Sequence, residues 1–124
     1  MKKLILAVTL ILTAPVMANH WNFECPAGGG RTANILINNK KAKIIAPFAR
    51  GIFIVESASG SSKVYKGTTN EGQATLLAPN INFQLNSIPM GENAEFTYEV
   101  AGPHEALILK CKTVPTLKRD PDLN

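Results

Sequence analysis

The feature that most constrains this chain is a succession of short β-branched and aromatic runs after residue 19, separated by Gly, Pro, Asn and Ser. Short strands at intervals of roughly 8–12 residues are typical of an all-β sandwich or barrel. No window has the apolar period of an amphipathic helix. We therefore expect eight or nine strands, at 21–25, 33–37, 42–46, 52–56, 62–66, 73–77, 80–85, 94–100 and 105–112.

The strands are expected to form a small antiparallel barrel of about eight strands. Along residues 94–100, Phe96 and Tyr98 alternate with polar residues, so one face of this strand should pack in the core and the other should face solvent. A sheet of this many strands must manage its edges by closing into a barrel or stacking into a sandwich. A barrel brings the first and last strands together naturally, and the sandwich is the alternative.

The first eighteen residues have the pattern of a secretory signal peptide. Lys2 and Lys3 precede an apolar run over 4–16, and the stretch closes on Val-Met-Ala at 16–18. The run is shorter than the roughly 20 apolar residues of a membrane span. No Cys follows directly, so a lipoprotein anchor is not expected. We predict a periplasmic or secreted protein, without a membrane anchor after cleavage.

Cleavage after residue 18 leaves one domain, and we expect a barrel over 19–112 and a polar, flexible tail over 113–124. The chain has two cysteines, Cys25 and Cys111. In an oxidising compartment, such a pair near the ends of a small domain indicates a disulfide tying the terminal strands. This bond would stabilise the fold by about 4–5 kcal/mol on the loop-entropy model. A metal or reactive-thiol pair is disfavoured because no CxxC occurs.

Charge is unevenly distributed along the sequence. Seven Lys and Arg but one Glu fall within 31–66, whereas five Glu and no cation fall within 71–105. Such a chain can present a positive and a negative face that steer a charged partner. The alternative is ordinary solvated charge alternating with core residues. No nucleic-acid recognition motif appears, and the cations are not interleaved with aromatics, so nucleic acid is not an expected partner.

The motifs of an enzyme are missing from the sequence. Before the tail, the predicted mature chain has no Asp, so a Ser-His-Asp triad within the barrel is not expected. His20 and His104 lack the spacing of metal ligands. The Gly-rich stretch 28–30 lacks the Lys-Ser/Thr of a phosphate-binding loop. We therefore expect no catalytic activity, no metal and no cofactor.

The most distinctive surface candidate is the Ser-rich segment 57–65, which follows an expected apolar strand. It should form an exposed loop carrying Ser59, Gly60, Lys63 and Tyr65. Hydroxyls, an ammonium and a phenol suit insertion into an acidic, sugar-binding cleft. The alternative is a small hairpin loop with solvated ends.

Two short motifs resemble those of the membrane-bound and periplasmic inhibitors of C-type lysozyme. Ser-Ala-Ser-Gly at 57–60, followed by Tyr65, resembles the Ser-Gly-x-x-Tyr loop of that family, with the Tyr two residues later. Residues 98–109 resemble its Tyr-x-x-x-Gly-x-x-Ala-x-Leu signature, with one extra residue after the Gly. The resemblance implies a small exported eight-stranded barrel with a Cys near each end.

The same resemblance implies a mechanism for the loop. Ser59 would meet the catalytic carboxylates of the lysozyme, with a Lys contributed nearby. No Lys occurs between Lys66 and Lys110, so Lys63 or Lys66 would take that part. We expect an exported protein that binds a C-type lysozyme or another cell-wall glycosidase. The alternatives are a barrel that binds an apolar ligand in its interior, and a structural or adhesive envelope module with an unpaired edge strand.

Overall fold

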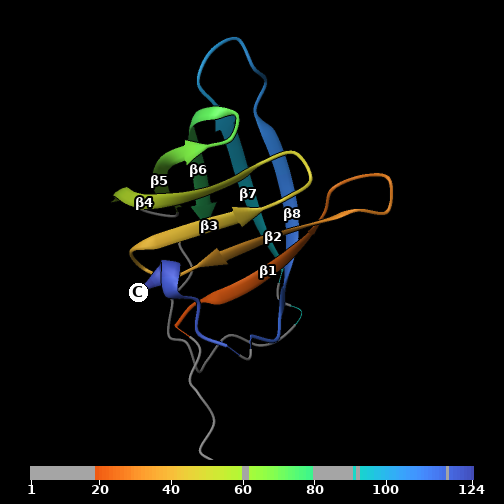
Figure 1. Ribbon diagram of the computed structural model, residues 1–124, viewed down its shortest axis with the longest axis vertical. Helices are drawn as coiled ribbons and strands as arrows, with labels where there is room; N and C mark the ends of the chain where they lie inside the picture. The colour runs from red at the N-terminus through yellow and green to blue at the C-terminus, as the bar shows by residue number, and fades with distance from the viewer. Residues whose placement is uncertain (1–18, 60–61, 80–90, 92, 117) are drawn as a thin grey trace, which may run out of the picture.

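The computed structural model describes residues 19–59, 62–79, 91, 93–116 and 118–124. They form one closed antiparallel barrel in which each strand pairs with its neighbours in the sequence and the last pairs with the first (Figure 1). The strands are β1 (Trp21–Pro26), β2 (Thr32–Ile37), β3 (Lys41–Ile45), β4 (Arg50–Ser59), β5 (Ser62–Thr69), β6 (Gly72–Pro79), β7 (Asn93–Val100) and β8 (Leu107–Val114). The predicted eight-stranded barrel is confirmed. The strand expected at 80–85 lies outside the described residues.

The barrel interior is packed with large side chains contributed by alternate residues of the strands. The Phe23 and Phe96 rings meet edge to face with centroids 5.1 Å apart, and Phe53 meets Tyr98 at 6.5 Å. Burial of one such side chain contributes roughly 1.5–3 kcal/mol. Besides the two half-cystines, the largest fully buried side chains come from seven of the strands and the tail: Tyr65, Phe23, Phe53, Phe96, Ile35, Ile37, Ile44, Leu76 and Leu123.

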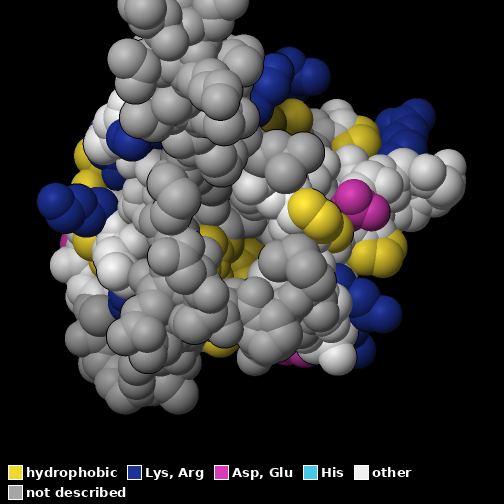
Figure 2. Space-filling view, turned by 90° about the horizontal axis from the view of Figure 1, so that it is seen from below, with side chains coloured by type: hydrophobic (Ala, Val, Ile, Leu, Met, Phe, Trp, Pro, Cys, Tyr) yellow, Lys and Arg dark blue, Asp and Glu magenta, His cyan; other side chains and the backbone are white. Residues whose placement is uncertain are grey.

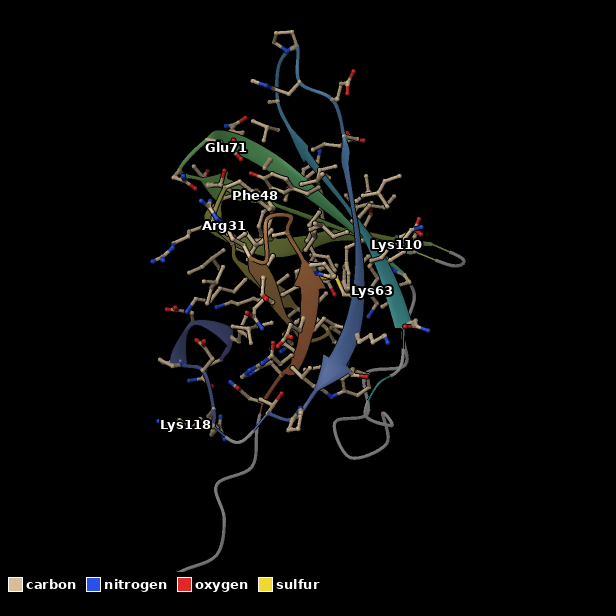
Figure 3. All side chains as sticks on the ribbon, turned by 90° about the vertical axis from the view of Figure 1, so that its right-hand side faces the viewer. Arg31, Phe48, Lys63, Glu71, Lys110 and Lys118 are labelled. Atoms are coloured by element: carbon tan, nitrogen blue, oxygen red, sulfur yellow. A yellow bond between two sulfur atoms is a disulfide. The ribbon has the colours of Figure 1, made fainter. Side chains whose placement is uncertain are left out.

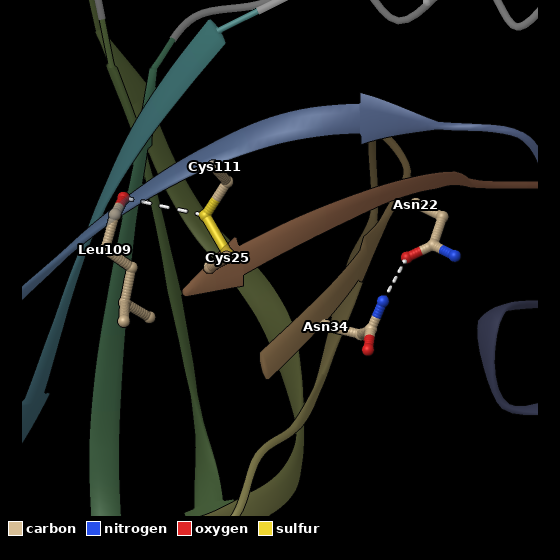
Figure 4. The surroundings of a disulfide bond; sticks show 5 residues. All are labelled: Asn22, Cys25, Asn34, Leu109 and Cys111. Carbon is tan, nitrogen blue, oxygen red and sulfur yellow. Dashed lines mark hydrogen bonds between the residues drawn. A yellow bond between two sulfur atoms is a disulfide. The ribbon is translucent and has the colours of Figure 1, made fainter. Parts of the chain in front are cut away.

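A disulfide joins Cys25 on β1 to Cys111 on β8, as predicted (Figure 4). The two residues continue the β1–β8 register one step beyond the pair Glu24↔Lys112, and their Cα atoms are 4.2 Å apart. Both half-cystines are buried. The bond therefore lies inside the barrel at its closing seam, and it is compatible with an oxidising location.

The two ends of the barrel differ in what they carry. One end holds the β3–β4 and β5–β6 connections, and Phe48 and Glu71 lie there, away from Lys118 (Figure 3). At that end the Tyr98 hydroxyl donates to Oε1 of Glu71 at 2.9 Å. The other end, here called the tail end, holds the β2–β3 turn, the tip of the β4–β5 hairpin and residues 118–124 (Figure 1).

The C-terminal residues dock on the tail end, contrary to the flexible tail expected for 113–124. A 3₁₀ turn, η1 (Pro121–Leu123), buries Leu123, and the Lys43 ammonium pairs with Asp120 at 3.2 Å and Asp122 at 2.8 Å. The expectation rested on the polar composition of the segment. The buried Leu123 and the two carboxylates that pair with Lys43 hold it there, together with hydrogen bonds from Asn19 and Asn38.

Two glycines let β4 and β5 approach closely where the barrel wall curves. A Cβ on Gly67 would overlap the carbonyl oxygen of Ile52, and one on Gly51 would lie 2.6 Å from that of Thr68. Both glycines stand opposite the neighbouring strand in the β4–β5 register. Only a residue without a side chain fits at these positions.

None of the helical segments in the described residues has the length and apolar character needed to cross a bilayer. The predicted signal peptide, residues 1–18, lies outside the described part of the chain.

Candidate functional site

The β4–β5 hairpin continues past its neighbour β3 at the tail end. Pairing of β4 with β3 ends at Lys41↔Ile54, whereas pairing of β4 with β5 continues to Ser59↔Ser62. A β-bulge between Val55 and Ser57 shifts the register on the way, and bulges bend a strand and re-aim its side chains. The backbone of Ser59 therefore lies at the end of a hairpin that extends past β3, whereas β6 accompanies β5 as far as Ser62↔Pro79 (Figure 1). Its side chain, like all of Gly60, lies outside the described part of the structure.

Lys63 lies near the start of β5, on the side of the strand that faces the barrel mouth. Its ammonium donates to Oδ1 of Asn39 at 2.9 Å. Desolvation by the surrounding protein lowers the pKa of Lys63 below its ordinary value. Residues two apart on a strand share a face, so Lys63 lies above Tyr65, as predicted. That face turns toward the barrel mouth and away from the outer wall.

Tyr65 is a core residue, and the expectation that it lies on an exposed surface is wrong. Its side chain is fully buried, and its hydroxyl donates to the backbone carbonyl of Asn38 at 2.9 Å. Burial raises the pKa of the phenol well above its ordinary value. The strand alternation turns Tyr65 inward, where the ring packs in the core and the turn carbonyl satisfies the hydroxyl.

Asn38 connects the candidate hairpin to the tail, a role that the sequence reasoning missed. Besides receiving the Tyr65 hydrogen bond, it donates from Nδ2 to the carbonyl of Leu123 at 2.7 Å and to that of Asn19 at 3.3 Å. Its Oδ1 accepts from the backbone N–H groups of the two lysines that close the turn. The available signal was the Asn-Asn-Lys sequence, which is typical of an Asx turn.

The docked tail interacts with Lys43 of β3 and with His20, which precedes β1. The hydrogen bond to Asp122 raises the pKa of Lys43, and Asp120 adds to this effect. Burial by itself would raise the pKa of Asp120, but hydrogen bonds from the Asp122 backbone N–H and the Lys43 ammonium together lower it. Desolvation lowers the pKa of His20, which is 4% exposed beside them. The tail end therefore favours a neutral His20 imidazole and an ionised Asp120 carboxylate.

The described Lys and Arg side chains that are visible at the tail end are not gathered into one patch. In Figure 2, Lys and Arg side chains are spread around the periphery of this face, with apolar side chains between them. Lys66, on the hairpin, pairs with Glu56 at 3.1 Å. Among the described residues, no group of three or more His, Cys, Asp or Glu is placed to hold a metal ion.

A groove of about 950 Å³ runs along the outside of the seam between β1 and β8. Its lining combines three cations, Arg31, Lys110 and Lys112, with two acidic residues, Glu24 and Glu95. None of these five side chains takes part in the ion pairs found among the described residues. The groove lies away from the Ser-rich hairpin, and the sequence analysis did not single it out.

Comparisons of the chain with protein-family models, with curated proteins and with solved structures give no match. The resemblance to lysozyme inhibitors therefore stays a prediction based on the two short motifs.

Proposed function

We propose that this protein is an exported binding protein that inhibits a C-type lysozyme, or another cell-wall glycosidase, with the tip of its β4–β5 hairpin. The observation that carries this proposal is the continuation of the hairpin past the last β3–β4 pair to Ser59↔Ser62. A Ser-rich hairpin that extends past β3 is suited to enter a cleft in another protein.

The chemistry of the tip fits the active site of a glycosidase. Such enzymes carry a pair of carboxyl groups that flank the scissile bond. The Ser59 hydroxyl would donate to one of them, and the Lys63 ammonium would pair with the other. In the free protein, Lys63 donates to the neutral amide oxygen of Asn39. A charge-assisted bond to a carboxylate is about twice as strong as one between neutral groups, so Lys63 would exchange Asn39 for the carboxylate on binding.

The interior of the barrel supports a protein partner over an apolar ligand. Phe23 and Phe96 pack against each other across the interior, and Tyr65 is fully buried below the mouth. Small eight-stranded barrels are commonly filled by side chains in this way. We therefore place the binding function on the outside of the barrel.

The proposal includes a periplasmic or secreted location. The disulfide is compatible with an oxidising compartment. Expression of the full chain in an exporting bacterial host, followed by N-terminal sequencing, tests whether the protein is exported and processed. We expect a mature protein that begins at Asn19. A protein recovered from the cytoplasm with Met1 still present would contradict it.

Inhibition of lysozyme tests the function itself. The exported protein is titrated into a cell-wall lysis assay with purified C-type lysozyme, alongside the variant Ser59→Ala/Lys63→Ala. We expect a loss of inhibition of at least about tenfold, because each lost charge-assisted bond is worth about 1.5–3 kcal/mol. The matched control is Lys66→Ala. Although the sequence left Lys66 as an alternative for this role, its side chain lies on the opposite face of β5 from Lys63 and pairs with Glu56, so this variant should leave inhibition unchanged. No inhibition by the unmutated protein, or equal inhibition by the double variant, would contradict the proposal.

A further inference from the structure

The barrel seam between β1 and β8 is closed over part of its length. The two strands pair from Asn22↔Val114 to Glu24↔Lys112, and the disulfide follows. Beyond the disulfide, β1 ends at Pro26 and pairs only with β2. β8 extends further in this direction, from Lys110 back to Leu107, where it pairs with β7 alone among the described residues. One edge of β8 is therefore open over these four residues.

An open edge is suited to pair with another strand. Alternate residues along it direct their N–H and C=O groups away from the barrel. Leu107 is 41% exposed and Ile108 is 57% exposed. The proline that ends β1 keeps that strand from extending the pairing, and no other strand among the described residues pairs with this edge of β8.

A row of outward-facing side chains leads across the barrel wall to this edge. The registers place Val64 opposite Leu77, Leu77 opposite Thr97, and Thr97 opposite Ile108. Leu77 is itself 39% exposed. Because directly opposite residues face the same side of a sheet, the four side chains form one mostly apolar row that ends at Ile108.

We propose that the open edge of β8 pairs with the same edge of a second copy of this chain. Two antiparallel edges related by a two-fold axis at Ile108 place this residue opposite its own copy and Lys110 opposite Ala106 of the second copy. The apolar row then continues into the row of the second copy. A two-fold axis at Lys110 would instead set two ammonium groups directly opposite each other, which is destabilising.

Charge also favours this register. Extending the β7–β8 register by one residue beyond Tyr98↔Leu107 places Ala106 beside the exposed Glu99. In the dimer, Lys110 of one copy would reach over this small Ala106 toward Glu99 of the other. An interface made from one surface used twice is the commonest arrangement of soluble homodimers. Because four residues bury little area, the dimer is weak, with a dissociation constant of about 10 μM to 1 mM.

The test is sedimentation equilibrium of the exported protein, obtained from the full chain, from about 10 μM to 1 mM, spanning this expected range. We expect a monomer–dimer equilibrium whose dissociation constant rises at least about tenfold, or 1.4 kcal/mol, in Ile108→Lys. The matched control is Ile54→Lys. Ile54 is 60% exposed, and it is the last residue of β4 that pairs with β3. This variant should dimerise like the unmutated protein.

Amide exchange keeps the test independent of variant folding. In the unmutated protein, exchange within Leu107–Lys110 should slow as the concentration rises through the dissociation constant, while exchange in β3 should not change. A protein that stays monomeric at the highest concentration overturns the proposal. So does a dimer that Ile54→Lys weakens as much as Ile108→Lys, or one without protection of this segment.

Discussion

The Tyr65 hydroxyl donates to the backbone carbonyl of Asn38 at 2.9 Å, and this bond links the core of β5 to the turn that holds the C-terminal tail. The ring fills the barrel just below Lys63. Tyr65 therefore supports the candidate site from within, and the partner would meet only the residues above it.

Replacing Tyr65 with Phe should lower stability without changing binding. The variant keeps the buried ring but removes the bond to Asn38, and a typical hydrogen bond contributes about 0.5–1.5 kcal/mol net. Urea denaturation should show a loss of this size with an unchanged slope. Lysozyme inhibition at a temperature where both proteins are folded should be equal. A large loss of inhibition in the folded variant would contradict this interpretation and would indicate that Tyr65 contributes to binding.

Reducing the disulfide should cost most of the stability of the barrel. Cys25–Cys111 closes a loop with a sequence separation of 86 residues, which corresponds to about 4–5 kcal/mol on the loop-entropy model. Denaturation with and without a reductant measures this difference, with Cys25→Ser/Cys111→Ser as the genetic equivalent. An unchanged midpoint would mean that the three β1–β8 residue pairs hold the seam without the covalent bond.

Acidification should destabilise the docked tail in two stages. The pKa of His20 is lowered in the folded protein, so the unfolded chain binds the proton more readily and stability falls as the pH drops below 6.5. The pKa of Asp120 is also lowered, so its contribution is present above pH 3.8 and is lost as the pH falls through the folded value. The unfolding free energy, measured between pH 8 and pH 3, should therefore fall first as His20 takes up a proton and again, at lower pH, as Asp120 does.

The matched variant for the first stage is His20→Gln. It removes the titrating group, so stability should change less between pH 7 and pH 5 than in the unmutated protein. Equal slopes in the two proteins would contradict the role given to the buried imidazole.

Replacing Gly67 with Ala should damage the fold more than its size suggests. The added Cβ would overlap the Ile52 carbonyl oxygen, and backbone atoms of β4 must move to admit it. We expect a loss of about 1–3 kcal/mol, the range for overpacking. Thr68→Ala, at the exposed neighbouring position, should stay within about 0.5–1 kcal/mol. Thermal unfolding compares the two, and a Gly67→Ala variant as stable as Thr68→Ala would contradict the close approach.

Period-two alternation and the cysteine pair were enough to predict the barrel. Phe96 and Tyr98 alternate with polar residues, so their faces could be assigned from the local pattern alone. Cys25 and Cys111 lie on the first and last strands, so their pairing indicated closure. Both signals depend on spacing within a strand or on chain ends, which the sequence displays directly.

The candidate site was harder to predict because it depends on which way a short strand turns. The sequence placed Lys63 and Tyr65 on one face but could not show that this face turns inward. The docking of the tail depends on Asn38 meeting Leu123, which are 85 positions apart. Nothing in the local pattern of either residue indicates such a contact.

The most direct test of the central claim is calorimetric titration of a C-type lysozyme with the exported protein. We predict saturable one-to-one binding that is lost in Ser59→Ala/Lys63→Ala and kept in Lys66→Ala. No heat of binding from the unmutated protein, or the same affinity in the double variant, would contradict the account.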